Sequence, residues 1–163
     1  MTTCKRGGCL FCDIYEKGTE VIYENEFFYS QFDRFPISPG HSEVIPKRHV
    51  ANLQALTSEE WKNFFPAIQD TIGIIESTNL WEKYNLFIKD SVNEQSKIYC
   101  AQALLHPGLT RTKPDAYNHG LNDGEAAGRS IHHLHWHIIP RYFGDVENPR
   151  GGIRHIIPEK GNY

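Results

Sequence analysis

Three histidines recur at every second position near the end of the chain, at His133, His135 and His137. In an extended strand, successive side chains point to opposite faces, so these three imidazoles would project from one face. The residues between them are apolar and predict the buried face of the same strand. Three imidazoles in a row contribute little to packing, so the spacing predicts a chemical site.

Two kinds of chemistry could use this row. Three neutral imidazoles can bind a catalytic zinc ion that keeps one coordination position open, as in hydrolytic metal enzymes. Alternatively, one imidazole attacks an electrophile while its neighbours hold the charged group. Upstream, the segments Asn122-Asp123-Gly124 and Gly128-Arg129-Ser130 supply a turn and polar donors. Such donors favour a phosphoryl group over a bare metal, although the spacing alone leaves both alternatives open.

Residues 128–141, GRSIHHLHWHIIPR, resemble the signature of the histidine triad superfamily, His-φ-His-φ-His-φ-φ with φ apolar. The similarity covers about residues 9–140, excluding a long segment near 90–115. Its further motifs follow the family's order: Phe11-Cys12-Asp13, Pro39-Gly40-His41, residues 44–49 (VIPKRH) and Asn122-Asp123-Gly124. The tail at 144–154 resembles that of bacterial diadenosine polyphosphate hydrolase-like members. The resemblance implies a nucleotide hydrolase or nucleotidyl transferase that cleaves at the α-phosphate.

The resemblance also implies the catalytic residues. His135 matches the nucleophile, which would attack the α-phosphorus and form a nucleotidyl-histidine intermediate. A neutral imidazole near pH 7 is suited to this role. His137 matches a ligand of the α-phosphate, and His41 matches a second group at the phosphate and leaving-group side. Ser130 and Asn122 match polar contacts to the phosphate and the leaving group.

The same resemblance implies how a purine nucleotide would bind. Asp33 matches the residue that accepts hydrogen bonds from the ribose hydroxyls, and Phe11 and Ile14 match the base pocket. Arg129 stands where the family often has glutamine, and would add a cation beside the phosphate. Three structural alternatives stay open: Asp33 as a turn residue before Pro36, Phe11 and Ile14 as plain core, and Arg129 facing solvent.

A Cys-x-x-Cys pair, Cys9 and Cys12, lies near the N-terminus. The spacing alone fits zinc binding, redox chemistry or no function, although a redox motif normally has a βαβ context that this chain lacks. By resemblance to zinc-binding histidine triad proteins and to galactose-1-phosphate uridylyltransferases, His49 and His133 would complete a structural zinc site. Such a site would remove His133 from catalysis. Cys4 has no expected role.

The composition limits the class of protein. The chain has 163 residues, of which 39% are hydrophobic and 23% charged, which predicts one soluble globular domain over 1–163. A formal net charge of −3 argues against a general nucleic-acid-binding surface. No apolar run is long enough for a membrane span, and no secretory signal is visible, so we expect a cytoplasmic protein without a membrane partner.

Periodicity predicts an α+β domain: an antiparallel sheet with one long helix, in the histidine triad fold. The helix would begin at a capping box formed by Thr57 and Glu60, with a kink or an offset start at Pro66. Residues 90–115 are expected to form an inserted surface excursion, or else a substrate-contacting lid, with one short helix near 99–105. Strands are expected at 21–24, 26–33, 42–46, 84–88, 116–122 and 132–142.

The resemblance implies a homodimer, which the sequence itself does not show. Three functions other than hydrolysis of diadenosine polyphosphates or other adenine nucleotides stay open. They are an adenosine phosphoramidase-type hydrolase, a metal hydrolase that uses the three histidines around catalytic zinc, and a non-catalytic nucleotide-binding protein. The sequence does not decide whether water or phosphate is the second acceptor.

Overall fold

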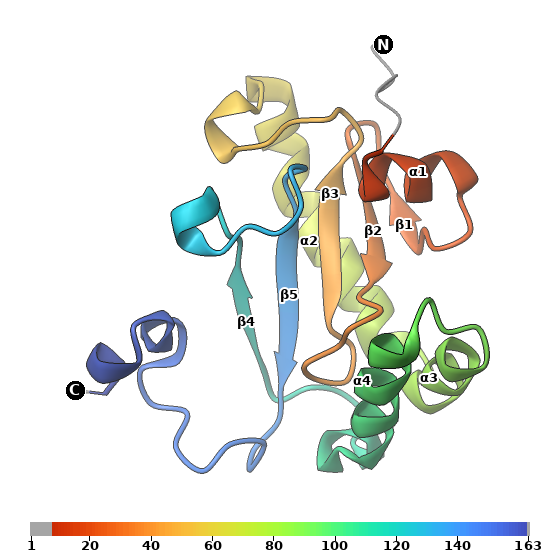
Figure 1. The fold of residues 1–163 in the computed structure, drawn as a ribbon, viewed down its shortest axis with the longest axis vertical. Helices are drawn as coiled ribbons and strands as arrows, with labels where there is room; N and C mark the ends of the chain where they lie inside the picture. The colour runs from red at the N-terminus through yellow and green to blue at the C-terminus, as the bar shows by residue number, and fades with distance from the viewer. Residues whose placement is uncertain (1–7, 163) are drawn as a thin grey trace.

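The computed structural model describes residues 8–162, and Cys4 lies outside this range. The described chain is an α+β domain built on a five-stranded antiparallel sheet, with strand order β1-β2-β3-β5-β4 (Figure 1). The strands are β1 (Tyr23–Glu24), β2 (Phe28–Phe32), β3 (Ser42–Pro46), β4 (Ala116–Gly120) and β5 (Trp136–Arg141). The helices are α1 (Leu10–Lys17), α2 (Ser58–Ser77), α3 (Leu80–Lys89) and α4 (Glu94–Leu105). Short 3-10 turns lie at Leu53–Ala55, Pro107–Thr110, Glu125–Ala127, Gly152–Ile156 and Pro158–Lys160.

The longest helix, α2, covers one face of the sheet and runs behind it in Figure 1. Its capping box is confirmed, because the Thr57 hydroxyl accepts from the Glu60 backbone N–H and the Glu60 carboxylate accepts from that of Thr57. The helix continues through Pro66 without interruption. Its inner side packs on the strands through ring contacts such as that between Phe64 and Phe28.

Helix α1 packs on the opposite face of the sheet. Phe11 of α1 forms a small buried cluster with Tyr29 of β2 and Ile45 of β3, and the Tyr29 hydroxyl donates to the Phe11 carbonyl over 2.7 Å. Side chains one position earlier on the same strands, Phe28 and Val44, belong to the core beneath α2. Because side chains alternate along a strand, the α1 face is left to carry the candidate site.

The prediction of a strand at 84–88 is wrong, because these residues belong to helix α3. The Asn79 side chain caps this helix by accepting from the Glu82 backbone N–H. Tyr84 and Phe87 are the buried residues of the helix, three positions apart, and they form one face of it. Over five residues an alternating pattern and a helical one share several apolar positions, which explains the error.

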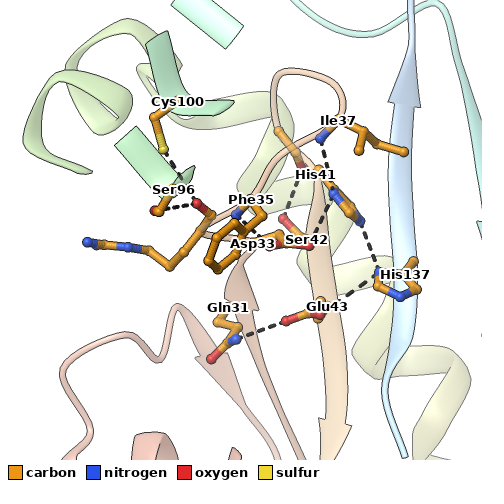
Figure 2. A network of polar contacts seen from close by, with 12 residues as sticks. Gln31, Asp33, Phe35, Ile37, His41, Ser42, Glu43, Ser96, Cys100 and His137 are labelled. Atoms are coloured by element: carbon orange, nitrogen blue, oxygen red, sulfur yellow. Dashed lines mark hydrogen bonds and ion pairs between the residues drawn. The ribbon is translucent and has the colours of Figure 1, made fainter. Parts of the chain in front are cut away.

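The surface excursion expected at 90–115 is also wrong for its central part. Cys100 and Ala103 of helix α4 belong to the main hydrophobic core. The Ser96 hydroxyl of the same helix donates to the Arg34 carbonyl over 2.6 Å. Helix α4 therefore supports the turn that follows β2, and this turn leads to His41 (Figures 1 and 2).

Strand β3 occupies the range expected from the sequence, while the histidine strand is shorter than expected. Strand β5 begins at Trp136, so His133 and His135 precede the regular ladder. None of the helices in the described part of the chain combines the length and the apolar character that a bilayer span requires. The homodimer implied by resemblance stays a prediction.

Candidate active site

Three neighbouring strands place polar side chains in one row on the α1 face of the sheet. Gln31 of β2 pairs in register with Glu43 of β3, and Glu43 pairs with His137 of β5. The next row toward the turn holds Asp33 and His41, whose backbones are joined by a bond from the Asp33 N–H to the His41 carbonyl. Figure 2 shows these five side chains converging between β2 and β5.

The predicted nucleophile, His135, lies beside His137, with ring centroids 5.0 Å apart. Its Nδ1 is 2.7 Å from the main-chain carbonyl of His133. A carbonyl oxygen can only accept, so Nδ1 carries the proton and Nε2 keeps the free lone pair. Burial lowers the pKa of His135, and the hydrogen bond to His133 opposes this. His135 is thus held as a neutral imidazole with a free Nε2.

A chain of polar contacts connects Asp33 to His137 through His41. Nε2 of His41 lies 3.0 Å from Nδ1 of His137, and Nδ1 of His41 lies 3.3 Å from Oδ2 of Asp33. The pKa values of both His41 and His137 are lowered to about 4, mainly by burial and in smaller part by the neighbouring histidines. Both imidazoles are therefore neutral at neutral pH, so the free site holds few fixed positive charges.

These depressed pKa values predict how the histidines titrate. In an NMR titration, the ring resonances of His41 and His137 should remain those of neutral imidazole down to about pH 5, because both pKa values are near 4. The variants His41→Gln and His137→Gln assign the resonances. A midpoint near 6.5 for either ring would contradict the burial seen at this site.

Asp33 takes part in the turn and also contacts His41. Its Oδ1 accepts from the Phe35 backbone N–H over 2.7 Å, which is the turn role that the sequence left open. Its Oδ2 faces His41. Burial raises the pKa of Asp33, while the bond from Phe35 lowers it. The carboxyl is still partly accessible, since 15% of its side-chain surface is exposed.

Gly40 holds the turn close to the body of the domain. Its φ is +86°, a conformation that favours glycine, and its N–H donates to the Tyr84 hydroxyl over 2.7 Å. A Cβ at this position would lie 2.8 Å from a methyl group of Ile75. The close approach fixes where the following residue, His41, enters the site.

The Cys-x-x-Cys pair meets the two predicted histidines at one buried place. Cys9, Cys12, His49 and His133 bring four ligand atoms within 4.8 Å of one another. The Sγ–Nδ1 distances are 3.4 Å for Cys9 to His133, 3.5 Å for Cys12 to His49 and 3.6 Å for Cys12 to His133. A tetrahedral zinc with ordinary Zn–S and Zn–N bonds requires about 3.6 Å between such atoms.

The surroundings of His133 also fit a metal ligand. Its Nε2 lies 2.8 Å from the Pro46 carbonyl, so Nε2 carries the proton and Nδ1 is free to face the cysteines. A second ring nitrogen bonded to a carbonyl is usual for metal-binding histidines. The residues present therefore fit a structural zinc ion with two thiolate and two imidazole ligands.

Three further predicted residues, Phe11, Ile14 and Arg129, lie around the histidines or brace a loop. Phe11 packs on His135 with ring centroids 5.0 Å apart, and Ile14 is half-buried beside the same small cluster. Arg129 donates to the Ala51 carbonyl and lies 4.0 Å from Asp123, so its guanidinium braces a loop.

Ser130 and Asn122 are both exposed. Ser130 lines a surface hollow together with Cys9 and His49. Asn122 follows two residues after Gly120, which pairs with His137. Neither residue has a described contact with His135, so their catalytic roles stay predictions.

Two residues of the site were not predicted from the sequence. Glu43 and Gln31 are buried at the centre of the polar row, and Gln31 Nε2 donates to Glu43 Oε2 over 2.9 Å. The pKa of Glu43 is raised to about 8, mainly by burial and in smaller part by the nearby Asp33 carboxyl. A charged residue inside the otherwise buried strand 42–46 was the signal that could have identified Glu43.

Known proteins are similar to this chain over most of its length. The HIT domain family matches residues 15–144. A HIT-like protein of Methanocaldococcus jannaschii is 28% identical, and the match covers 85% of this chain and 83% of the relative. A bis(5′-adenosyl)-triphosphatase of Saccharomyces cerevisiae is 30% identical over 76% of this chain and 44% of that protein.

Solved structures agree with the family match. The structure of a HIT family member from Bacillus subtilis is 28% identical, covers 85% of this chain and 76% of that chain, and has a TM-score of 0.57. A Zn-bound histidine triad family protein from Mycobacterium smegmatis is 26% identical, with coverage of 86% and 80% and a TM-score of 0.52. Because the family match spans most of the chain and the fold agrees, this protein belongs to the HIT family.

Proposed function

We propose that the protein is a nucleotide hydrolase or nucleotidyl transferase that cleaves at the α-phosphate through a nucleotidyl-histidine intermediate. The observation that carries this proposal is the state of His135, a neutral imidazole whose Nδ1–H is held by the His133 carbonyl and whose Nε2 is free. Family membership supports the same class of chemistry.

The proposed reaction has two steps. Nε2 of His135 attacks the α-phosphorus, a P–N bond forms, and the P–O bond to the leaving group breaks, so that a phosphate leaving group departs as its anion and any other leaving group takes a proton from water. Water or another acceptor then attacks the same phosphorus, and the P–N bond breaks to restore the neutral imidazole. His137 and His41 lie beside His135 and would hold the phosphate, with Ser130 and Asn122 contacting the leaving group.

Diadenosine polyphosphates or other adenine nucleotides are the proposed substrates. The name of the yeast relative, a bis(5′-adenosyl)-triphosphatase, supports this class. Asp33 would accept from the ribose hydroxyls, and Phe11 and Ile14 would contact the purine. Arg129 would contribute positive charge from the loop that it braces. The zinc ion would be structural, held by the two cysteines and by His49 and His133.

A substrate panel tests this function. Diadenosine tri- and tetraphosphate, adenosine phosphoramidate and nucleoside diphosphate derivatives are incubated with the protein, with and without inorganic phosphate. Release of AMP supports hydrolysis. With diadenosine tetraphosphate, whose leaving group is ATP, ADP that forms only when phosphate is added identifies phosphate as the second acceptor. AMP binding without turnover of any compound would contradict the catalytic proposal and identify a nucleotide-binding protein.

The proposed ribose contact predicts a preference for ribonucleotides. A 2′-deoxy substrate leaves one hydrogen bond to Asp33 unmade, and bonds to charged groups are worth roughly 1.5–3 kcal/mol, so kcat/KM should fall about tenfold or more. Asp33→Asn keeps an acceptor and should keep most of the preference, whereas Asp33→Ala should lose it. The measurement is kcat/KM for one substrate in its ribo and deoxy forms.

Comparing the two forms separates ribose binding from the contact between Asp33 and His41. A displaced His41 would slow both substrates equally and leave their ratio unchanged. If wild type and Asp33→Ala show the same ratio, Asp33 serves the turn and His41 alone.

A further inference from the structure

Gln31 and Glu43 form a buried polar pair on the site face of the sheet. Gln31 is 4% exposed and Glu43 is 6% exposed, and a single hydrogen bond between their side chains joins them. The other carboxyl oxygen, Glu43 Oε1, lies 3.9 Å from Nδ1 of His137, which is beyond hydrogen-bond distance. One oxygen of the carboxyl is thus available on the side of the histidines.

The pair is incompletely satisfied within the protein. Gln31 Oε1 is buried and has no hydrogen-bond partner among the described residues. Flipping the side-chain amide of Gln31 would only exchange the unpaired oxygen for an unpaired NH₂ group. Buried polar groups without partners are uncommon, and an apolar pair would fill the same place without this penalty. A contact with a ligand would supply a partner that the described residues do not.

The pair occupies the middle of the site face. On one side lie Asp33 and His41, and on the other lies the apolar cluster that includes Tyr29 and Ile45. If Asp33 binds the ribose and the base lies toward Phe11, the nucleoside has to lie across the row of side chains between these two residues. That row is Gln31 and Glu43.

Resting on the proposed function, we propose that Glu43, oriented by Gln31, contacts the nucleobase and selects adenine by the hydrogen-bonding edge that carries its amino group. Adenine presents an amino donor next to a ring-nitrogen acceptor. A neutral carboxyl group offers one donor and one acceptor side by side, which complements this edge. The proposal adds a specificity residue to the site and gives a physical reason for the adenine class of substrates proposed above.

The environment of Glu43 favours the neutral form that this recognition requires. Burial and, in smaller part, the Asp33 carboxyl raise the pKa of Glu43 to about 8, even though the bond from Gln31 opposes the shift. The other titratable groups facing it are His137 at 3.9 Å and His135, together with Tyr29. Both histidines have lowered pKa values, so no cation next to Glu43 favours its ionised form.

Binding of nucleoside 5′-monophosphates to the full chain tests the proposal without requiring turnover. Calorimetry gives Kd for AMP, for purine riboside monophosphate, which lacks only the amino group, and for the monophosphates of inosine and guanosine. Wild type should bind AMP about tenfold or more tighter than the other three. Glu43→Gln keeps a donor and an acceptor and should preserve this preference, whereas Glu43→Leu should bring all four ligands within about threefold.

Thermal unfolding separates recognition from a structural role. Glu43→Leu and Gln31→Leu should melt no lower than wild type, because each replaces an incompletely bonded polar group by an apolar one. Tighter binding of GMP than AMP to wild type would overturn the proposal. So would an unchanged preference in Glu43→Leu, or an equal loss for all four ligands, which would indicate an action on the phosphate or on His137. Absence of nucleotide binding altogether would instead refute the proposed function.

Discussion

Replacing His135 with alanine should lower turnover of the best nucleotide substrate by several orders of magnitude while the protein remains folded. The substitution removes the atom that would form the covalent intermediate, and loss of a nucleophile commonly has effects of this size. The imidazole packs on Phe11 at the edge of the small apolar cluster, apart from the main core beneath α2. Single-turnover kinetics on wild type and variant, together with circular dichroism, make the comparison.

His132→Ala is the matched control, because His132 is exposed and lies in the same segment. It should keep wild-type turnover. The variant His135→Ala should still bind AMP, since binding does not require the covalent step. If His135→Ala retained more than a few per cent of the wild-type rate, the His135 imidazole would lower the activation free energy by only about 2 kcal/mol or less. The covalent mechanism would then be wrong.

Loss of the proposed zinc site should have the largest effect on stability. Purified protein should contain about one zinc per chain, and Cys9→Ser should abolish tight binding, because a serine hydroxyl is a poor zinc ligand. Binding energy of a structural zinc is also folding energy, so the melting temperature should fall by about 10 °C or more. The rate per folded molecule should fall much less. Metal analysis, thermal unfolding and activity measured on the same samples give these values.

Cys100→Ala controls for the loss of a thiol away from the metal cluster. Cys100 is buried against the Arg34 carbonyl, and this variant should keep a full equivalent of zinc. Protein that contains no zinc and melts unchanged after Cys9→Ser would contradict the structural role. Zinc that survives Cys9→Ser but is lost in His135→Ala would favour the catalytic-metal alternative.

The sequence predicted the elements that carry strong local signals. The capping box of Thr57 and Glu60 fixes the start of α2, and the strand at 42–46 is bounded by a glycine turn and a proline. The meeting of Cys9 and Cys12 with His49 and His133 could be predicted because the resemblance supplied the two histidines as partners for the cysteines. These features depend on a few residues whose chemistry is specific.

The features that the sequence missed depend on tertiary packing. Helix α3 contains an alternating stretch, and besides the Asn79 cap it is the burial of Tyr84 and Phe87 against the core that distinguishes it from a strand. The sequence marks Glu43 as a charged residue of a strand, but its burial beside Gln31 and His137 depends on the pairing of β3 with β2 and β5. The second contact of Asp33, with His41, arises because the turn folds back on itself.

The acceptor that orients His135 is a main-chain carbonyl, that of His133. No codon specifies that oxygen, so no amino-acid replacement at position 133 can delete it. Point mutation can therefore remove the proposed zinc ligand His133 and the proposed nucleophile His135 separately, yet the carbonyl group that sets the tautomer of His135 stays in the chain in every variant. A mutation can alter this hydrogen bond only by moving the backbone. An insertion, a deletion or a change in the contacts that anchor residues 133–135 would do so.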